Sequence, residues 1–222
     1  MELSVVIAAL NEEEQVTGAI QSAREAGAEI IVVDGGSRDS TRSRAEAAGA
    51  LVLSSPRGRA QQLETGARAS RGDVIVFLHA DTRLPTGYRK ELEKALKDRE
   101  VAGGAFGLRF DQRTPALRLV EWLARRRASI LGLPYGDQAL FVRREVLAAI
   151  GGVPSVPIME DLDLVIAMRR RGRLALLSSD VVTSARRYRS SGVMRTAAAH
   201  LLATLAWAMG IERARIAGWL RS

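Results

Sequence analysis

The chain has 222 residues, of which 47% are hydrophobic and 26% charged, the balance of a globular protein with one domain. It contains no cysteine, which excludes disulfides and thiolate metal sites, and its formal net charge of +8 favours an anionic partner. Because aromatic residues make up only 5% and are not interleaved with basic ones, we expect no nucleic acid among its partners.

The first hundred residues alternate between short apolar runs and amphipathic segments. The apolar runs predict buried strands at 3–9, 29–33, 51–54 and 74–78. The segments between them predict helices from Asn11 to about Ala26, at 40–48, from the basic turn at Pro56 to near Ser70, and at 85–99. Asn11 is the expected N-cap of the first helix. This order predicts a parallel sheet with helices on its faces.

The second half of the chain follows a different pattern. We expect strands at 103–110 and 137–142, with possible edge strands at 174–177 and 181–186. Helices are expected at 115–131, at 144–150, from about Pro157 to Arg171, at 194–209 and at 212–220.

Acidic residues recur where the predicted strands end. The run from Ile75 to Thr82 is apolar and stops at His79-Ala80-Asp81, so these residues should lie at the carboxyl edge of the sheet, where α/β proteins bind ligands. Glu12 and Asp34 follow two other predicted strands, Asp137 stands at the start of one, and Glu160 and Asp161 lie at the start of a later helix. A single acid in such a place is usually a cap or turn residue. Several in succession favour a ligand site.

Four motifs in this order resemble those of family 2 glycosyltransferases with the GT-A fold. Residues 4–12 resemble the family's first strand and Asn-Glu turn, and 31–41 its Val-Asp-Asp-Gly-Ser-x-Asp-x-Thr motif. Residues 77–81 resemble the strand leading to its Asp-x-Asp metal motif. Glu160-Asp161 resembles the pair that holds the catalytic base of inverting members. The resemblance covers about residues 3 to 190. It implies a Rossmann-like, mostly parallel α/β sheet with a C-terminal helical extension.

The resemblance also implies roles for individual residues, in transfer of a sugar from a nucleotide-diphosphate donor, most favourably a UDP-sugar. The donor would be bound by Ala8, Leu10, Glu12, Asp34, Gly35, Arg59, Ala80 and Asp137, with Asp34 at the base and Arg59 near the diphosphate. Mg²⁺ or Mn²⁺ would be held by Asp81 together with His79. Asp161 would deprotonate the acceptor hydroxyl, and Glu160 would orient Asp161 or the acceptor.

Three positions depart from the usual family pattern. Ala8 replaces a proline, Gly35 replaces the second acid of Asp-Asp-Gly-Ser, and His79 replaces the first acid of Asp-x-Asp. A subgroup of short bacterial members also carries a His-Ala-Asp triplet, and we place the chain there by resemblance. His79 has two readings, a metal ligand or a packed and hydrogen-bonded residue. We interpret His200, in an apolar helix, as structural.

We expect one domain over 1–222, with a nucleotide-sugar-binding half at 1–100, an acceptor-binding half at 101–190 and C-terminal helices at 191–222. The start shows no signal-peptide pattern, so a cytoplasmic location is the default. Residues 196–211 carry no charged side chain, and arginines cluster at 125–127 and 186–189. This apolar helix could meet the inner face of the membrane, the core or a second subunit, and the acceptor could be a small molecule or lipid-linked.

Two other functions compete with the glycosyltransferase. A nucleotidyltransferase can share the sheet architecture, but it would be expected to have a basic, glycine-rich loop after the first strand, where this chain is acidic from Glu12 to Glu14. A non-catalytic module that binds nucleotide sugars or docks to a membrane is the third reading, motivated by His79 and Gly35.

Overall fold

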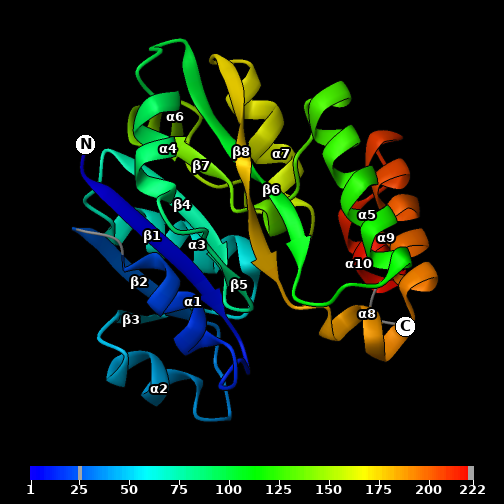
Figure 1. Ribbon diagram of the computed structural model, residues 1–222, viewed down its shortest axis with the longest axis horizontal. Coiled ribbons are helices and arrows are strands. Elements are labelled where there is room, and N and C mark those ends of the chain that lie inside the picture. Colours follow the sequence, from blue (N-terminus) through cyan, green and yellow to red (C-terminus); the bar gives the residue numbers. More distant parts are fainter. Residues whose placement is uncertain (25–26, 220–222) are drawn as a thin grey trace.

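The computed structural model describes residues 1–24 and 27–219 and shows an eight-stranded sheet flanked by helices (Figure 1). The strand order is β3-β2-β1-β4-β7-β6-β8-β5. The strands are β1 (Leu3–Ala9), β2 (Ala28–Asp34), β3 (Leu51–Ser54), β4 (Val74–His79), β5 (Thr82–Arg83), β6 (Val101–Phe110), β7 (Phe141–Arg143) and β8 (Arg173–Thr183). The helices are α1 (Val16–Ala23), α2 (Thr41–Ala47), α3 (Arg59–Ala69), α4 (Tyr88–Ala95), α5 (Pro115–Arg126), α6 (Arg144–Ala149), α7 (Glu160–Arg169), α8 (Arg186–Ser191), α9 (Val193–Ala208) and α10 (Arg213–Trp219), with a π-helical turn η1 (Arg127–Leu131) and a 3-10 turn η2 (Gly136–Gln138).

The first four predicted strands are confirmed, and they pair in parallel in the order β3-β2-β1-β4. The apolar runs of β1 and β4 are continuous because both faces of the sheet are covered there, whereas β3 at the edge is partly exposed. In β1, Val5 and Ile7 pack into one core cluster and Val6 into the other. In β4, Val76 and Phe77 divide in the same way. All four strands therefore end at one edge, where His79 is the last residue of β4.

In the second half, two strand predictions are wrong. The strand expected at 137–142 begins only at Phe141, because Gly136–Gln138 forms a 3-10 turn. The Gln138 side chain holds that turn, since it accepts the Tyr135 N–H (3.2 Å) and donates to the Phe106 carbonyl (3.0 Å). The two predicted edge strands form one strand, β8, which lies between β6 and β5.

The predicted start of the first helix is also wrong. Asn11 has φ 54° and is not an N-cap, and α1 begins only at Val16. The side-chain oxygen of Asn11 instead accepts the backbone N–H of Arg38 (2.9 Å), and this hydrogen bond ties the loop after β1 to the loop after β2. α1 ends at Ala23; the predicted end at Ala26 and the end of the last helix at Leu220 lie outside the described residues.

The C-terminal helices form the predicted extension. α8 was not predicted as a helix. The C-terminal helices lie at the end of the molecule opposite α2 and β3, where α9 packs against α5 and α10 (Figure 1). Among the residues that the structure describes, no helix is both long and apolar enough to cross a membrane. The division into two functional halves stays a prediction, although one core cluster contains residues from Leu3 to Tyr188.

Candidate active site

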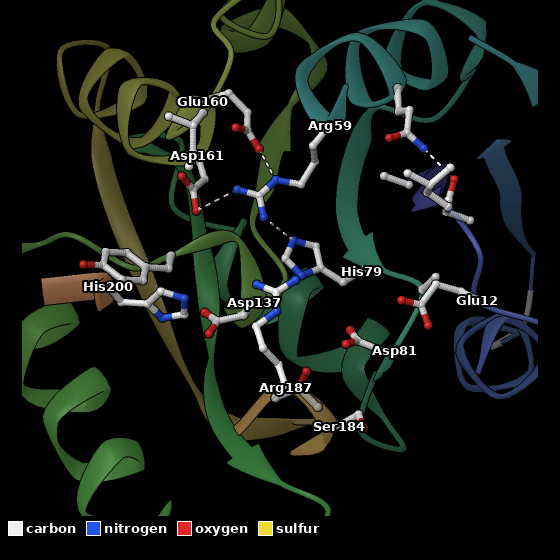
Figure 2. Close-up of a pocket in the computed structure, with 18 of the residues that line it drawn as sticks. Glu12, Arg59, His79, Asp81, Asp137, Glu160, Asp161, Ser184, Arg187 and His200 are labelled. Atoms are coloured by element: carbon white, nitrogen blue, oxygen red, sulfur yellow. Dashed lines mark hydrogen bonds and ion pairs between the residues drawn. The ribbon is translucent and has the colours of Figure 1, made fainter. Parts of the chain in front are cut away.

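A pocket of about 470 Å³ opens at the carboxyl ends of β1 and β4 and is closed on its other side by residues from α7, α8 and α9 (Figure 2). Ten of the twelve predicted site residues line it: Ala8, Leu10, Glu12, Arg59, His79, Ala80, Asp81, Asp137, Glu160 and Asp161. The remaining two, Asp34 and Gly35, are not among its lining residues. Residues up to 153 positions apart in the sequence, from Ala8 to Asp161, therefore meet at one sheet edge, as ligand sites of open α/β sheets do.

Glu12 stands at the rim beside the end of β1. Its backbone N–H donates to the Thr41 hydroxyl (2.7 Å), which fixes the loop against α2. Nη2 of Arg186 contacts both carboxylate oxygens, at 2.7 and 2.8 Å, so one charged nitrogen holds the carboxylate in place. Burial raises the pKa of Glu12, and Arg186 acts in the opposite direction.

Asp34 and Gly35 make local contacts instead of facing the pocket. The Asp34 carboxylate accepts the N–H groups of Gly36 and Ser37, each at 3.2 Å, within its own turn. A Cβ on Gly35 would lie 3.0 Å from the Gln62 amide, so Gly35 leaves room for that side chain. Gln62 in turn donates to the carbonyls of Ala9 (2.7 Å) and Val33 (2.8 Å), tying β1 to β2. Donor binding by Asp34 and Gly35 stays a prediction.

His79 ends β4 and is neutral at ordinary pH. Burial and the neighbouring Arg59 guanidinium lower its pKa to about 4. Its Nε2 lies 3.3 Å from Nη1 of Arg59, and since the guanidinium can only donate, the imidazole accepts there. Asp81 lies two residues on, with its carboxylate near Glu12 in Figure 2 and the Thr82 hydroxyl at 3.3 Å. Among the described residues, no group of three or more histidines or acids is arranged to hold a metal ion.

Arg59 gathers the two acids at the start of α7. It forms an ion pair with Glu160, which is only 2% exposed, and its Nη2 lies 3.6 Å from Oδ2 of Asp161. Burial opposes the charge of Arg59, but the two carboxylates outweigh it and hold the arginine pKa above its usual value. Asp161 also accepts the backbone N–H of Gly136 at 2.7 Å. A Cβ on Gly136 would lie 3.2 Å from both Oδ2 of Asp161 and Nε2 of His79, so a larger residue here would crowd both side chains.

Asp137 carries a carboxylate oxygen without a partner. Its Oδ1 is buried and has no hydrogen-bond donor in the described part of the chain. Burial raises the pKa of Asp137 to about 6, while Arg127 acts against that change. A buried polar atom left unpaired costs about 1–3 kcal/mol, so this oxygen is the group in the pocket most in need of a ligand donor.

Backbone strain gathers around the same pocket. In the described ranges, three non-glycine residues have positive φ: Asn11 at 54°, Ala139 at 48° and Met159 at 63°. Each lies within two residues of a lining residue, and Met159 itself lines the pocket directly before Glu160. Such conformations cost about 1–3 kcal/mol each and collect at functional sites.

Much of the wall comes from residues that the sequence analysis did not select. Ser184, Arg187 and Tyr188 lie in the Ser-Ala-Arg-Arg-Tyr stretch, whose clustered arginines were the available signal. Tyr135 also lines the pocket and lies under the Arg127 guanidinium, 3.2 Å from the ring centre. His200, interpreted as structural, is in the wall too, edge-on to the Tyr188 ring at 6.2 Å.

Three comparisons place the chain among known proteins. It is 38% identical over 96 residues to glucosyl-3-phosphoglycerate synthase of Mycolicibacterium paratuberculosis, an alignment of 37% of this chain and 29% of that protein. It is 29% identical over 166 residues to undecaprenyl-phosphate 4-deoxy-4-formamido-L-arabinose transferase of Pseudomonas aeruginosa, which covers 67% of this chain and 49% of that protein. The chain therefore matches less than half of the length of either curated relative.

Solved structures give the fold. The glucosyl-3-phosphoglycerate synthase of Mycobacterium tuberculosis, crystallised with Mn²⁺, uridine diphosphate and glucosyl-3-phosphoglycerate, matches with a TM-score of 0.66 and 25% identity. The match covers 95% of this chain and 80% of that one. S. aureus TarS matches with a TM-score of 0.65 at 16% identity, over 91% of this chain and 66% of that one. The fold is the GT-A fold, and since the family model matches residues 4–147, the chain belongs to glycosyl transferase family 2.

Proposed function

We propose that this glycosyltransferase moves a sugar from a UDP-sugar to a hydroxyl acceptor with inversion at the sugar carbon. One observation carries the proposal: a single pocket presents Asp81 on one side and Asp161 with Arg59 on the other (Figure 2). Binding of Mn²⁺ and uridine diphosphate by the similar mycobacterial enzyme supports this donor. In single displacement the acceptor attacks from the face opposite the leaving group, so one base and one site for the diphosphate suffice.

The donor side of the pocket would be formed by Ala8, Leu10, Glu12 and Ala80. Glu12 is held by Arg186 and keeps its carboxylate at the rim, where it can accept hydroxyl groups of the ribose. The proposal for Asp34 and Gly35 requires their turn to open toward the base, because Asp34 is occupied by its own backbone.

The residues at the end of β4 fit a divalent cation such as Mg²⁺ or Mn²⁺. The Asp81 carboxylate supplies the oxygen donor that these ions prefer, and a neutral His79 has a lone pair to offer. When bound, the cation would neutralise charge on the diphosphate. Because Arg59 already donates to Nε2 of His79, ligation by that atom requires Arg59 to move. We also place the chain in the short subgroup with the His-Ala-Asp triplet.

Asp161 is the proposed general base and Glu160 its positioning partner. Gly136 fixes one Asp161 oxygen from the backbone, while Arg59 joins both acids. Movement of Arg59 toward a bound diphosphate would release Asp161 for the acceptor hydroxyl and add a cation where negative charge develops.

The acceptor side would be formed by Asp137 and the wall from α8 and α9. The unpaired Oδ1 of Asp137 can accept a hydroxyl of the donor sugar or of the acceptor. The names of both curated relatives point to phosphate-bearing molecules, phosphoglycerate and undecaprenyl phosphate. A small or lipid-linked acceptor with a phosphate group is therefore our proposal for this chain too, with Arg187 in the wall as an attractive charge.

The test is release of uridine diphosphate from a panel of UDP-sugars with Mn²⁺ and a phosphate-bearing acceptor. Asp161→Asn should lose at least about a hundredfold in kcat, within the usual range for a general base, and still bind uridine diphosphate. Asp163→Asn is the matched control on the same helix, because Asp163 binds Arg213 (2.9 Å) and does not line the pocket. Full turnover by Asp161→Asn would overturn its role as base.

The competing functions give different results in the same assay. A nucleotidyltransferase would release pyrophosphate from a nucleoside triphosphate and a sugar phosphate. A non-catalytic module would bind uridine diphosphate with Mn²⁺ and release none from any UDP-sugar and acceptor.

A further inference from the structure

The surface formed by α5, η1 and α9 is unusually apolar. Of the fourteen large apolar side chains that are exposed in the described residues, ten lie on α5, η1 and α9 or at Met209, the residue after α9. Side chains such as Trp122, Leu123, Leu201, Leu202 and Leu205 are each 49–62% exposed. Single exposed apolar residues are normal, but a concentration on neighbouring elements marks an interaction site. We call this region the apolar helical surface.

The exposed side chains of α9 form one stripe along the helix. Met194, Leu201, Leu205 and Met209 stand seven or four residues apart and therefore share a face. Met194 and Met209 are both 71% exposed. The opposite side of α9 is buried and includes small residues such as Ala203, and it brings His200 to the pocket. The outer stripe is thus not part of the core of this chain.

Most charges around the surface are positive, although acids lie at its edge, such as Asp180, which binds Arg125 (2.7 Å), and the exposed Glu212. From 112 to 136 the sequence has five arginines and one acid, and from 181 to 211 it has four arginines and no acid. The single acid in these two ranges, Glu121, is turned inward, where it accepts the Phe110 N–H (2.8 Å) and meets Arg113 (3.8 Å). Arg126 lies over the Trp122 ring at 5.3 Å, so an exposed cation and an exposed aromatic side chain stand together.

We propose that the apolar helical surface docks on an anionic lipid bilayer, with α9 lying in the plane of the interface. Apolar side chains would enter the boundary between headgroups and acyl chains, and the arginines would meet the anionic headgroups. The 16 residues of α9 span about 24 Å, less than the hydrocarbon core, which suits a helix lying on the membrane.

A second copy of the chain fits this surface less well. A two-fold interface brings the same patch of both subunits together, so each charge must find a complement within the patch itself. Because arginines outnumber acids at the rim of the patch, a second copy would set mostly like charges against each other, whereas anionic lipid complements both the arginines and the apolar stripe. Docking is independent of the proposed glycosyl transfer. If the chain is a glycosyltransferase of this kind, docking would bring the pocket close to the membrane, because one face of α9 lines the pocket and the other would lie on the bilayer.

Co-sedimentation with vesicles tests the proposal. The intact chain should bind vesicles of equal parts phosphatidylglycerol and phosphatidylcholine. Its affinity for pure phosphatidylcholine vesicles should be at least about tenfold lower, since each arginine near an anionic surface raises the affinity about fivefold. Leu201→Gln with Leu205→Gln should weaken binding at least about tenfold, and Arg118→Gln with Arg126→Gln should abolish the preference for anionic vesicles.

Matched controls come from the far side of the molecule. Leu51→Gln makes the same change at a 50% exposed leucine on β3. Arg99→Gln removes an exposed arginine outside the apolar helical surface. Both variants should bind vesicles like the wild type. Equal thermal unfolding of all variants shows that folding is intact. The proposal fails if the wild type does not sediment, or if the surface variants bind like the controls. A dimer in light scattering that the leucine variant dissociates, without vesicle binding, would assign the surface to a second copy.

Discussion

The buried carboxyl group of Asp137 gives this fold a pH dependence that can be worked out from the structure. Its pKa in the folded chain is about 6, against an ordinary value of 3.8. Between these pH values the folded protein holds a proton that the unfolded chain has released, so the free energy of unfolding falls as the pH rises. The full difference corresponds to about 3 kcal/mol above pH 6. Asp137→Asn stays neutral and should not suffer this loss.

Urea unfolding from pH 4 to pH 7.5 measures the effect. The free energy of unfolding of Asp137→Asn, relative to wild type, should rise by about 2.5 kcal/mol across this range, because part of the full effect already lies below pH 4. His79, with its pKa lowered to about 4, acts in the opposite direction but in both proteins, so the difference isolates Asp137. Parallel curves for wild type and Asp137→Asn would refute the reasoning.

Two further predictions concern the acids held by Arg59. Gly136→Ala adds a methyl group 3.2 Å from Oδ2 of Asp161, so kcat for uridine diphosphate release should fall more than about tenfold. Gly218→Ala is the control: its methyl group would meet nothing within 4 Å, so kcat should not change. Arg59→Met leaves the carboxylate of Glu160 buried without its partner and should lower the free energy of unfolding by about 2 kcal/mol. This is less than the about 3–5 kcal/mol of a fully buried pair, because Arg59 is 38% exposed. Adding Glu160→Gln should restore most of that loss in urea unfolding, and no restoration would contradict the pairing.

The parts of the fold that the sequence predicted well are those decided locally. Runs such as 3–9 and 51–54 are strands at the predicted bounds, because burial on both faces or glycine turns define them. β8 was missed as one strand because Ser178, Ser179 and Asp180 interrupt its apolar pattern. In the structure Glu91 accepts the N–H and hydroxyl groups of both serines, a contact 87 and 88 residues away in sequence that no local pattern contains.

The site divides in the same way. Predicted residues at the ends of β1 and β4 line the pocket because a parallel sheet brings strand ends together. The wall from α8 and α9 was missed, since its position depends on how the C-terminal helices fold back over the sheet. Asp34 illustrates the opposite limit: its motif indicates donor binding, but its side chain is occupied within its own turn. A motif fixes the place of a residue more firmly than the direction of its side chain.

The charge of the pocket wall argues that a diphosphate donor needs a cation here. Five carboxyl groups line the pocket against two guanidinium groups, those of Arg59 and Arg187, and Arg59 is already shared between two acids. A diphosphate brought to such a wall without a cation meets repulsion that low local dielectric strengthens. We therefore expect uridine diphosphate to bind at least about tenfold more tightly with Mn²⁺ than with a chelator, a difference of about 1.4 kcal/mol.

Asp81→Asn should remove most of that dependence on Mn²⁺ in calorimetric titrations, whereas His79→Ala separates the two readings of the histidine. If His79 is a metal ligand, its loss would weaken the metal-dependent part of binding. If His79 is a packed acceptor for Arg59, its loss would lower the free energy of unfolding and leave the metal-dependent part of binding intact. Equal affinity of the wild type for uridine diphosphate with and without chelator would mean that arginines alone balance the diphosphate. Arg59 and Arg187, the two guanidinium groups of the wall, would then be the residues to substitute.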